Sequence, residues 1–460
     1  MVRVFHHYVS AKLIFLVGLD ALLLLFAVYA GVAMNASLSG QAPVVSPANA
    51  FVYLIGILFV FAGTGFYQLN LLEHSKTIRR CLYATAPVCF AVTFLIASMG
   101  PKLGLTPDGL ALMVMVALTG SALLRFGVRR WSGAIAVKPR VLVLGTGSRV
   151  LKLADFAHLK QRHDVVGYVA LQGTKHFVPE SRILTIPEGE SLSSMVAKHD
   201  IDEIVLAVRD RRGGALPVQD LLQCRLKGVR VTELQSFFER EYRQVMLETI
   251  TPSWMVFGDG FSIGRCRDIV KRLFDVLAST TLFLLTLPVL LIAMLCIFVE
   301  SGFPLFYKQE RVGQGGRVFP VYKLRSMRSD AEKDGKPRWA AANDDRTTRV
   351  GRIIRKLRID ELPQIFNVLR GDMSLVGPRP ERPFFVDQLV NQIPYYSLRH
   401  TVKPGITGWA QVRYQYGSTL DDTVEKLQYD LYYVKNQGLF LDLTILLATI
   451  EVVLLGKGAR

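Results

Sequence analysis

The chain has 460 residues, half of them hydrophobic, and a mean hydropathy of +0.29. These values are high for a soluble protein and low for one that lies wholly in a membrane, so a mixed architecture of about two to four domains is expected. The formal charge of +17 suits nucleic acid, anionic lipid headgroups or phosphorylated substrates, and the apolar segments described below favour the last two. The five cysteines form no Cys-x-x-Cys pair, which argues against a disulfide framework or a zinc site.

Four apolar runs, each about long enough to cross a bilayer of about 30 Å as helix, fill the first third of the chain: residues 13–33, 51–69, 81–99 and 110–128. We therefore predict a four-helix transmembrane bundle over residues 1–132. Basic residues follow the second run (Lys76, Arg79, Arg80) and close the fourth (Arg125, Arg129, Arg130), whereas residues 34–50 carry no charge. The positive-inside rule then places both ends of the bundle on the cytoplasmic side. A cleaved signal peptide is the alternative for the first run, but its length and the three further runs favour an uncleaved anchor.

Residues 138–243 alternate between strand and helix patterns and predict a small open parallel α/β sheet, a Rossmann-like domain. Strands are expected at 141–144, 165–171, 204–208 and 229–232, with a helix at 148–161. Gly145 and Gly147 lie after the first strand, where a dinucleotide fingerprint would lie. Val150 replaces the third glycine, and no acidic residue ends the second strand. Nucleotide binding at Gly145 and Gly147 and a plain strand-to-helix turn both remain open.

A linker over residues 244–270 leads to a fifth apolar run, residues 276–299. Pro288 lies in its middle and removes a backbone donor, which kinks or breaks a helix. A full crossing would also carry the basic C-terminal region to the outer face, against the positive-inside rule. We therefore predict a re-entrant helix over residues 274–299 that breaks at Pro288, with a kinked fifth crossing as the alternative.

Two strands, residues 305–309 and 318–324, read as a hairpin around a glycine-rich tip. Lys323 and Arg325 lie two residues apart and are expected to share one face, which suits a phosphate-binding surface. The tip is either a phosphate cradle or, more simply, an ordinary hairpin turn.

Five arginines recur every third residue and predict a basic stripe on a helix that ends against a carboxylate pair, Asp360-Glu361: Arg346, Arg349, Arg352, Arg355 and Arg358. Most such stripes are solvated faces or contact anionic lipid. Asp360 also reads as a helix N-cap ahead of Pro363. A carboxylate at a helix start stays ionised, and beside arginines and a divalent cation it becomes a credible covalent nucleophile, with Glu361 holding the metal.

The turn Gly377-Pro-Arg-Pro380 holds Arg379 between two prolines, which suits a bidentate grip on phosphate. A rigid loop with an exposed arginine is the alternative. The final apolar run, residues 439–455, contains Asp442 and Glu451 and suggests an amphipathic interfacial helix.

Residues 271–460 resemble the monotopic phosphoglycosyl transferases, the bacterial sugar transferases that prime lipid-linked glycans. The resemblance rests on several dense motifs in one order. They are Lys-Arg-x-x-Asp before the membrane segment, Gln309-Glu-Arg-Val-Gly313, Tyr322-Lys-Leu-Arg-Ser-Met327, Asp360-Glu-Leu-Pro-Gln364, Asn367-Val-Leu-Arg-Gly-Asp-Met-Ser374, Gly377-Pro-Arg-Pro380 and Lys403-Pro-Gly-Ile-Thr-Gly408. One departure is Leu287-Pro288, where the family usually has Ser-Pro. The proline remains, so the break should persist, with Thr286 as a substitute for the serine.

The resemblance implies transfer of sugar-1-phosphate from a UDP-sugar to polyprenyl (undecaprenyl) phosphate with release of UMP, as the priming step of exopolysaccharide, capsule or O-antigen synthesis. By motif, Asp360 is the nucleophile that forms a phosphosugar intermediate, and Glu361 is the Mg²⁺ partner. Lys323, Arg355 and Arg379 match phosphate-contacting positions. The expected fold is a membrane α-helical bundle, an α/β Rossmann-like domain and an α+β monotopic catalytic domain with a re-entrant membrane helix, at the cytoplasmic face of a bacterial inner membrane.

Two other functions compete with this interpretation. A membrane-anchored nucleotide-sugar dehydratase needs a complete dinucleotide fingerprint followed by Tyr-x-x-x-Lys, and that spacing occurs only at Tyr8 to Lys12, ahead of the first helix. A non-catalytic scaffold for glycan assembly would not need Asp360. Nucleic acid is not an expected partner, and a homodimer is possible. The sequence does not specify which sugar is transferred.

Overall fold

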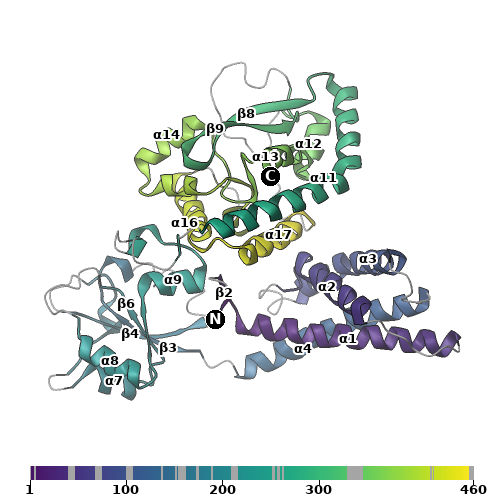
Figure 1. Ribbon diagram of the computed structural model, residues 1–460. Coiled ribbons are helices and arrows are strands. Elements are labelled where there is room, and N and C mark those ends of the chain that lie inside the picture. The colour runs from purple at the N-terminus through teal and green to yellow at the C-terminus, as the bar shows by residue number, and fades with distance from the viewer. Residues whose placement is uncertain are drawn as a thin grey trace. The chain divides into compact units, whose positions relative to one another are not determined.

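The computed structural model describes residues 2–454 except for residues 5–6, 40–46, 68–74, 100–106, 136–137, 151–152, 154–161, 172–175, 188–189, 209–215, 251–253, 256–259, 262–263, 329–345, 415–416 and 418. The chain divides into two compact units (Figure 1). The first combines Met1–Gly133 with Asp259–Arg460, and the second is Ala134–Gly258. The predicted segment 138–243 lies inside the second unit.

The N-terminal part of the first unit begins with a short antiparallel pair, β1 (Val2–Val4) and β2 (His7–Val9). Four helices follow: α1 (Ala11–Ser39), α2 (Pro47–Gly63), α3 (Ser75–Met99) and α4 (Pro107–Ile135). Among the described residues, α1, α3 and α4 are long and apolar enough to cross a membrane. The expectation for the second run was too long, because α2 ends at Gly63 and its apolar part, Ala50–Gly63, is shorter than the other three.

Arg125 does not behave as the loop charge that the positive-inside argument assumed. Its side chain is 1% exposed and forms a two-pronged ion pair with Asp20 of α1, with Nη1–Oδ1 and Nη2–Oδ2 distances of 3.2 and 2.9 Å. Ser121 donates to the same carboxylate, and Nε of Arg125 donates to the main-chain oxygen of Phe66. The guanidinium also lies 4.6 Å from the centre of the Phe66 ring. This pair ties α1 to α4 inside the apolar bundle.

The second unit is built on a five-stranded parallel sheet in the order β5-β4-β3-β6-β7. The strands are β3 (Arg140–Leu144), β4 (Asp164–Val169), β5 (Ile183–Leu184), β6 (Glu203–Leu206) and β7 (Arg230–Glu233). The helices are α7 (Leu192–Lys198), α8 (Val218–Leu226) and α9 (Leu234–Tyr242), with 3-10 turns η2 (Ser148–Val150), η3 (Glu180–Arg182) and η4 (Leu247–Thr249). Apolar residues of α7 and α8 pack on one face of the sheet and those of α9 on the other (Figure 1).

Four of these strands were predicted from the alternation of strand and helix segments in the sequence. Strand β5 was missed because a strand of two residues is too short to show a pattern. Most of the helix expected at 148–161 lies outside the described residues. What is described there begins as the 3-10 turn η2.

The C-terminal part of the first unit begins with the long helix α11 (Arg265–Ser301). A hairpin follows, β8 (Phe306–Val312) and β9 (Val318–Leu324), joined through η5 (Gln314–Gly316), as the sequence predicted. The remaining elements are α12 (Arg349–Lys356), η6 (Ile359–Glu361), α13 (Gln364–Arg370), β10 (Ser374–Val376), α14 (Pro383–Gln392), η7 (Tyr396–Thr401), β11 (Gly405–Thr407), α15 (Trp409–Arg413), α16 (Leu420–Asn436) and α17 (Leu439–Leu454). Strands β10 and β11 pair in parallel.

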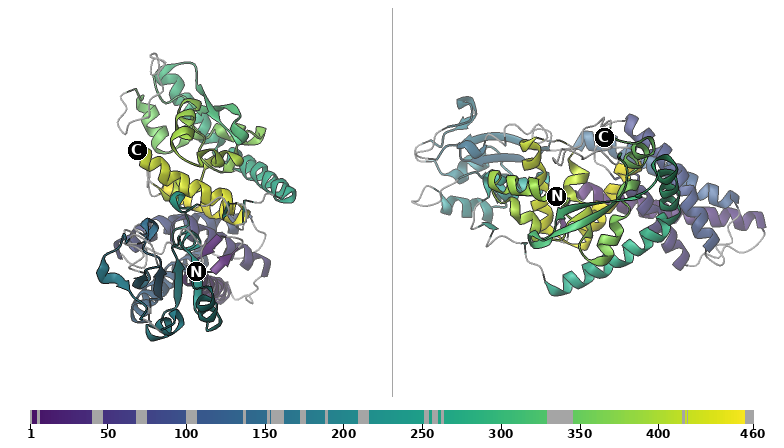
Figure 2. Two further views of the ribbon diagram at one scale, coloured as in Figure 1. Left: turned by 90° about the vertical axis from the view of Figure 1, so that its left-hand side faces the viewer. Right: turned by 90° about the horizontal axis from the view of Figure 1, so that it is seen from above.

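Helix α11 contains Pro288 and is helical at every residue across it, so the predicted break takes the form of a bend. Figure 1 shows α11 turning part-way along its length, and Figure 2 shows the same helix from two further directions. Thr286 donates its hydroxyl to the main-chain oxygen of Leu282, within the same helix. By length and composition α11 is also capable of crossing a membrane.

The Lys-Arg-x-x-Asp motif at the start of α11 anchors this helix to three other elements. Lys271 forms ion pairs with Asp275 and with Asp442 of α17, at 3.1 and 2.9 Å. Arg272 donates to the last carbonyls of α13, including that of Leu369 at 2.7 Å. Asp275 accepts from the hydroxyl of Ser374 in β10 at 3.0 Å. The motif therefore holds the first part of α11 on the rest of the unit.

Helix α17 differs from the interfacial helix that we expected. Its two acidic residues, Asp442 and Glu451, are 0% and 5% exposed, so they do not form a polar face toward solvent. The helix instead packs against α2, where Ile450 lies over Gly63. The pattern of isolated acidic residues was typical of an amphipathic helix, but Lys271 neutralises Asp442 inside the protein.

Candidate active site around Asp360 and Glu361

The carboxylate pair lies in the 3-10 turn η6, between α12 and α13. Asp360 and Glu361 are each 8% exposed. The turn begins at Arg358, whose φ of 56° places it in the left-handed region that a non-glycine residue rarely adopts. The expectation that Asp360 caps a helix was wrong. The residue before α13 is Pro363, and Asp360 lies inside the preceding turn.

Glu361 is surrounded by three basic side chains, one from strand β9, one from the residue before η6 and one from the Gly377-Pro-Arg-Pro380 turn. Its Oε1 accepts from Nζ of Lys323 on β9 at 3.0 Å and from Nη2 of Arg379 at 2.7 Å. Its Oε2 lies 3.8 Å from Nη1 of Arg358. The sequence brought Lys323 and Arg379 to this site by motif, and the structure places both of them on Glu361.

The two carboxyl groups have opposite pKa shifts. Burial, together with the neighbouring Glu361, raises the pKa of Asp360 to about 6, against the lowering effect of Lys323, Arg355 and Arg379. Although burial also disfavours an ionised Glu361, Arg379, Lys323 and Arg358 hold its pKa well below the usual range. Near neutral pH, Glu361 is therefore a fixed negative charge and Asp360 a carboxylate close to its titration point.

Arg355 is the cation near Asp360 that is still available to a ligand. It lies in the last turn of α12 and lowers the pKa of Asp360 through its charge. Its side chain has no hydrogen-bond or ion-pair partner among the residues that the structure describes. A phosphate beside Asp360 would find this guanidinium free to bind it.

The sequence suggested that the five arginines from Arg346 to Arg358 form one basic stripe on a helix, but they do not lie on one helix. Helix α12 covers only Arg349 to Lys356. Arg346 precedes it, and Arg358 follows it in the left-handed conformation. Arg349, Arg352 and Arg355 keep their spacing of three residues within α12. The helix ends before Arg358, whose left-handed conformation leads into η6 and its two carboxyl groups.

Arg325 lies elsewhere. Strand β9 ends at Leu324, and the guanidinium of Arg325 binds the C-terminal end of α11 through the main-chain oxygens of Ser301 and Gly302, at 2.8 and 2.6 Å. Its side chain is thus used to hold α11, and it is not among the groups that contact Glu361. A direct role in substrate binding stays a prediction.

Two residues at the site were not singled out from the sequence. The sequence identified Arg358 only as the last arginine of the stripe, although its guanidinium forms an ion pair with Glu361. Gln411 of α15 accepts from Nη1 of Arg379 at 2.9 Å. Gln411 lies about fifty residues from the Asp360-Glu361 pair in the sequence, so no local pattern predicts that it belongs to the site.

The glycine loop of the second unit forms a tight turn. Gly145 has φ of +123°, and an added Cβ would lie 3.2 Å from main-chain atoms of Ala207, so the site needs glycine for steric reasons alone. Gly147 has nothing within 4 Å of a hypothetical Cβ. Nucleotide binding at Gly145 and Gly147 stays a prediction.

The donor set is suited to Mg²⁺ only when a ligand shares the metal. Among the described residues there is no cluster of three or more His, Cys, Asp and Glu side chains. Two adjacent carboxylates are, however, what Mg²⁺ commonly takes from a protein when substrate phosphates and water complete its shell. Oε1 of Glu361 is occupied by two cations, whereas the 3.8 Å contact of Oε2 is longer than a hydrogen bond. Asp360 and Oε2 of Glu361 thus fit the metal.

These features define a membrane-associated α/β protein with a buried, charge-compensated carboxylate pair. Residues 266–456 match the family model described as bacterial sugar transferase. The chain belongs to this family.

Relatives of known name agree. The chain is 51% identical over 191 residues to the UDP-N-acetylgalactosamine-undecaprenyl-phosphate N-acetylgalactosaminephosphotransferase of Aeromonas hydrophila. It is 46% identical over 193 residues to the UDP-glucose:undecaprenyl-phosphate glucose-1-phosphate transferase of Caulobacter vibrioides, and 42% identical over 196 residues to the uncharacterized sugar transferase EpsL of Bacillus subtilis. These matches cover 41–42% of this chain. They span 45%, 70% and 91% of the Aeromonas, Caulobacter and Bacillus proteins, respectively.

Proposed function

We propose that the protein is a phosphoglycosyl transferase that moves sugar-1-phosphate from a UDP-sugar to undecaprenyl phosphate, with release of UMP. The observation that carries the proposal is the unequal carboxyl pair. Asp360 has a pKa of about 6 and lies among three cations, while Glu361 is held ionised beside it. A buried carboxylate that ionises near neutral pH suits nucleophilic attack on phosphorus.

The reaction proceeds in two displacements. A carboxylate oxygen of Asp360 attacks the β-phosphorus of the UDP-sugar, the bond from that phosphorus to the bridging oxygen breaks, and UMP leaves with the electron pair. An oxygen of undecaprenyl phosphate then attacks the same phosphorus. The bond to Asp360 breaks, which restores the carboxylate and releases the lipid-linked diphosphosugar.

The chain's own cations bind and orient the donor. Arg355 has no partner among the described residues and can take a phosphate oxygen, whereas Lys323 and Arg379 are within hydrogen-bonding distance of Glu361 and can share their charge with a bound diphosphate. Asp360 and Glu361 would hold Mg²⁺ through carboxylate oxygens. When bound, the metal would neutralise the charge of the diphosphate and make its phosphorus more electrophilic.

The membrane setting follows from the same proposal. Both substrates meet if α11 is re-entrant, so that the site stays on the cytoplasmic face of the inner membrane, where activated sugars are made. The reaction would then be a priming step of exopolysaccharide, capsule or O-antigen synthesis. A homodimer remains a prediction, and a non-catalytic scaffold is the alternative from another class.

The test is UMP release from a panel of UDP-sugars that includes UDP-glucose and UDP-N-acetylgalactosamine, with Mg²⁺, undecaprenyl phosphate and the full chain in nanodiscs. Asp360→Asn should lower the rate by about a thousandfold or more, since the nucleophile is lost. Asp387→Asn is the matched control, because Asp387 is an exposed carboxylate of α14 outside the motifs of the candidate site. Its rate should stay close to that of the wild type.

Intact-protein mass without the lipid acceptor provides the second readout. The wild type should gain the mass of a phosphosugar and Asp360→Asn should not. No UMP release from any sugar by the folded wild type, or full activity of Asp360→Asn, would favour the scaffold.

A further inference from the structure

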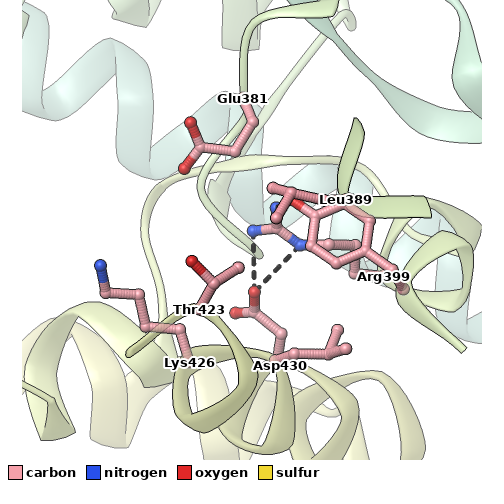
Figure 3. A pocket seen from close by; sticks show the side chains of 8 residues that line it. Glu381, Leu389, Arg399, Thr423, Lys426 and Asp430 are labelled. Carbon is pink, nitrogen blue, oxygen red and sulfur yellow. Dashed lines mark hydrogen bonds and ion pairs between the residues drawn. The ribbon is translucent and has the colours of Figure 1, made fainter. Parts of the chain in front are cut away.

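A small pocket, shown in Figure 3, has Glu381 in its wall, the residue that follows the Gly377-Pro-Arg-Pro380 turn. It is lined by Glu381, Leu389, Tyr396, Arg399, Thr423, Lys426, Leu427 and Asp430. At its base Arg399 of η7 faces Asp430 of α16, with side chains 7% and 4% exposed. The proposed reaction makes no use of this buried ion pair, so its position calls for an explanation.

Every nitrogen of the Arg399 guanidinium has a partner. Nε and Nη2 donate to Oδ2 of Asp430 at 3.1 and 2.8 Å, as Figure 3 shows, and Nη1 donates to the hydroxyl of Tyr396 at 2.8 Å. One further hydrogen bond of Arg399 connects the ion pair to the turn. Nη2 also donates to the main-chain oxygen of Arg379 at 2.9 Å. Asp430 thus fixes the plane of the guanidinium, and the guanidinium fixes one peptide of the turn.

Pro378 and Pro380 have no N–H groups and so cannot donate main-chain hydrogen bonds within the turn. Donors from other parts of the chain hold its carbonyl groups instead. The oxygen of Pro378 accepts from the main-chain N–H of Gly405 at 2.9 Å, and that of Pro380 accepts from Nη1 of Arg311 at 3.1 Å. Arg399 supplies the bond between these two. Three consecutive carbonyls are therefore held by groups from outside the turn.

The far end of the Arg379 side chain is held as well, by Glu361 and Gln411. Because the main chain and the guanidinium are both fixed, the direction of the side chain toward the dyad is set before any substrate binds. We propose that the Arg399–Asp430 pair is a positioning element that sets Arg379 against Glu361 for phosphoryl transfer. The inference rests on the proposed function.

A purely structural role is the competing explanation, because buried ion pairs often add little net stability but are damaging when broken. The two roles differ in how they combine with Arg379. A positioning pair acts through Arg379 and loses its effect once that guanidinium is removed. A structural pair weakens the whole fold, and its effect multiplies with that of any other change.

The experiment is a double-mutant cycle of Asp430→Asn and Arg379→Met in the full chain, read as kcat and KM of UMP release. Asp430→Asn alone should lower kcat by roughly tenfold to a hundredfold, the effect of displacing a catalytic group by about an ångström. KM for the donor should change less, because a displaced guanidinium still attracts a diphosphate. In the Arg379→Met background, Asp430→Asn should cause no further loss.

Asp387→Asn is the matched control, since it makes the same chemical change at an exposed position of α14, a helix that also borders the pocket. It should leave both constants unchanged. If Asp430→Asn does not fold, Arg399→Lys replaces it in the cycle. That variant keeps a positive charge near Asp430, but a compact ammonium lacks the planar fork by which the guanidinium reaches Asp430, Tyr396 and the main chain of Arg379.

Multiplicative losses in the double variant would overturn the inference and assign the pair to stability. An Arg379→Met variant with the kcat of the wild type would also overturn it and would remove Arg379 from the reaction, while the role of Asp360 would still stand. Absence of UMP release by the folded wild type is the separate outcome that refutes the proposed function, and the inference with it.

Discussion

Two adjacent carboxyl groups in one helical turn, with equal exposure, have pKa values that move in opposite directions. The difference comes mainly from the nearby charges: those of Arg379, Lys323 and Arg358 outweigh the effect of burial on the pKa of Glu361, whereas burial and the charge of Glu361 prevail at Asp360. Glu361 also accepts hydrogen bonds from Lys323 and Arg379, whereas the same cations reach Asp360 only through charge. Neighbours in sequence thereby acquire different properties, one as a fixed anion and the other as a carboxyl group with a pKa of about 6.

The first residue-scale prediction concerns pH. If ionised Asp360 is the nucleophile, kcat/KM for the UDP-sugar should rise up to tenfold per pH unit along an acidic limb that lies no higher than about pH 6. The carboxylate form predominates above its pKa of about 6, and Mg²⁺ bound beside it would lower that pKa further. The ratio kcat/KM for the UDP-sugar reports on the free enzyme and the first displacement, so titration of the lipid phosphate does not affect it.

The charge of Arg355 gives that profile an internal check. Arg355 lowers the pKa of Asp360, so Arg355→Met should move the acidic limb to higher pH. Arg352→Met on the exposed face of the same helix should leave the limb in place. A limb that stays fixed in both variants would show that Asp360 is not the group that titrates.

At the scale of the element, α11 is held at both ends by its own unit. Lys271, Arg272 and Asp275 bind its first turns to α13, β10 and α17. At the other end Arg325 binds its last carbonyls, and Glu300 accepts from the first N–H groups of α12. Two ends fixed to one folded unit are compatible with a bent helix that enters and leaves the same side of a membrane.

The corresponding prediction is that both ends of α11 face the cytoplasm. Single cysteines at position 266, the exposed native Cys266, and at position 310, made by Glu310→Cys, should both resist a membrane-impermeant thiol reagent added to spheroplasts. Both should react after permeabilisation, and UMP release by each variant confirms that it is folded. Labelling of one site from outside would mean that α11 crosses the membrane.

At the scale of the whole molecule, the chain combines an apolar bundle, an α/β unit and the C-terminal region that carries the candidate site. The first unit joins residues before Gly133 with residues after Asp259, and α2 packs on α17 within it. The bundle in turn contains the Asp20–Arg125 pair. An ion pair in an apolar bundle is expensive unless every group has a partner, and here the carboxylate also accepts from Ser121.

Breaking this pair should destabilise the bundle. Arg125→Met leaves Asp20 buried without its cation and is expected to cost about 3–5 kcal/mol, seen as a lower melting temperature in detergent. Arg130→Met, at an exposed position of the same helix, should have little effect. The double change Asp20→Leu with Arg125→Met should recover much of the loss, because no unpaired charge remains. Equal melting temperatures for Arg125→Met and the wild type would contradict the prediction.

Local patterns in the sequence predicted the long helices, most strands and the residues of the candidate site. The alternation of strand and helix segments predicted four strands of the parallel sheet, and two strand segments around a glycine-rich tip predicted the β8–β9 hairpin. The family resemblance assigned Asp360, Glu361, Lys323, Arg355 and Arg379 to one site. Such features depend on residues that are close in the chain, or on residue types that only one chemistry requires. The membership of the bacterial sugar transferase family follows from the same motifs.

Only the tertiary structure decided how single side chains are used. It sent Arg325 to the end of α11, buried Arg125 on Asp20, moved Asp360 from a helix cap into η6, and brought Gln411 and the Arg399–Asp430 pair to Arg379. The sequence contains every one of these residues, but their partners lie between about twenty and one hundred positions away. Pairing over such distances depends on how the elements pack, which no local pattern records.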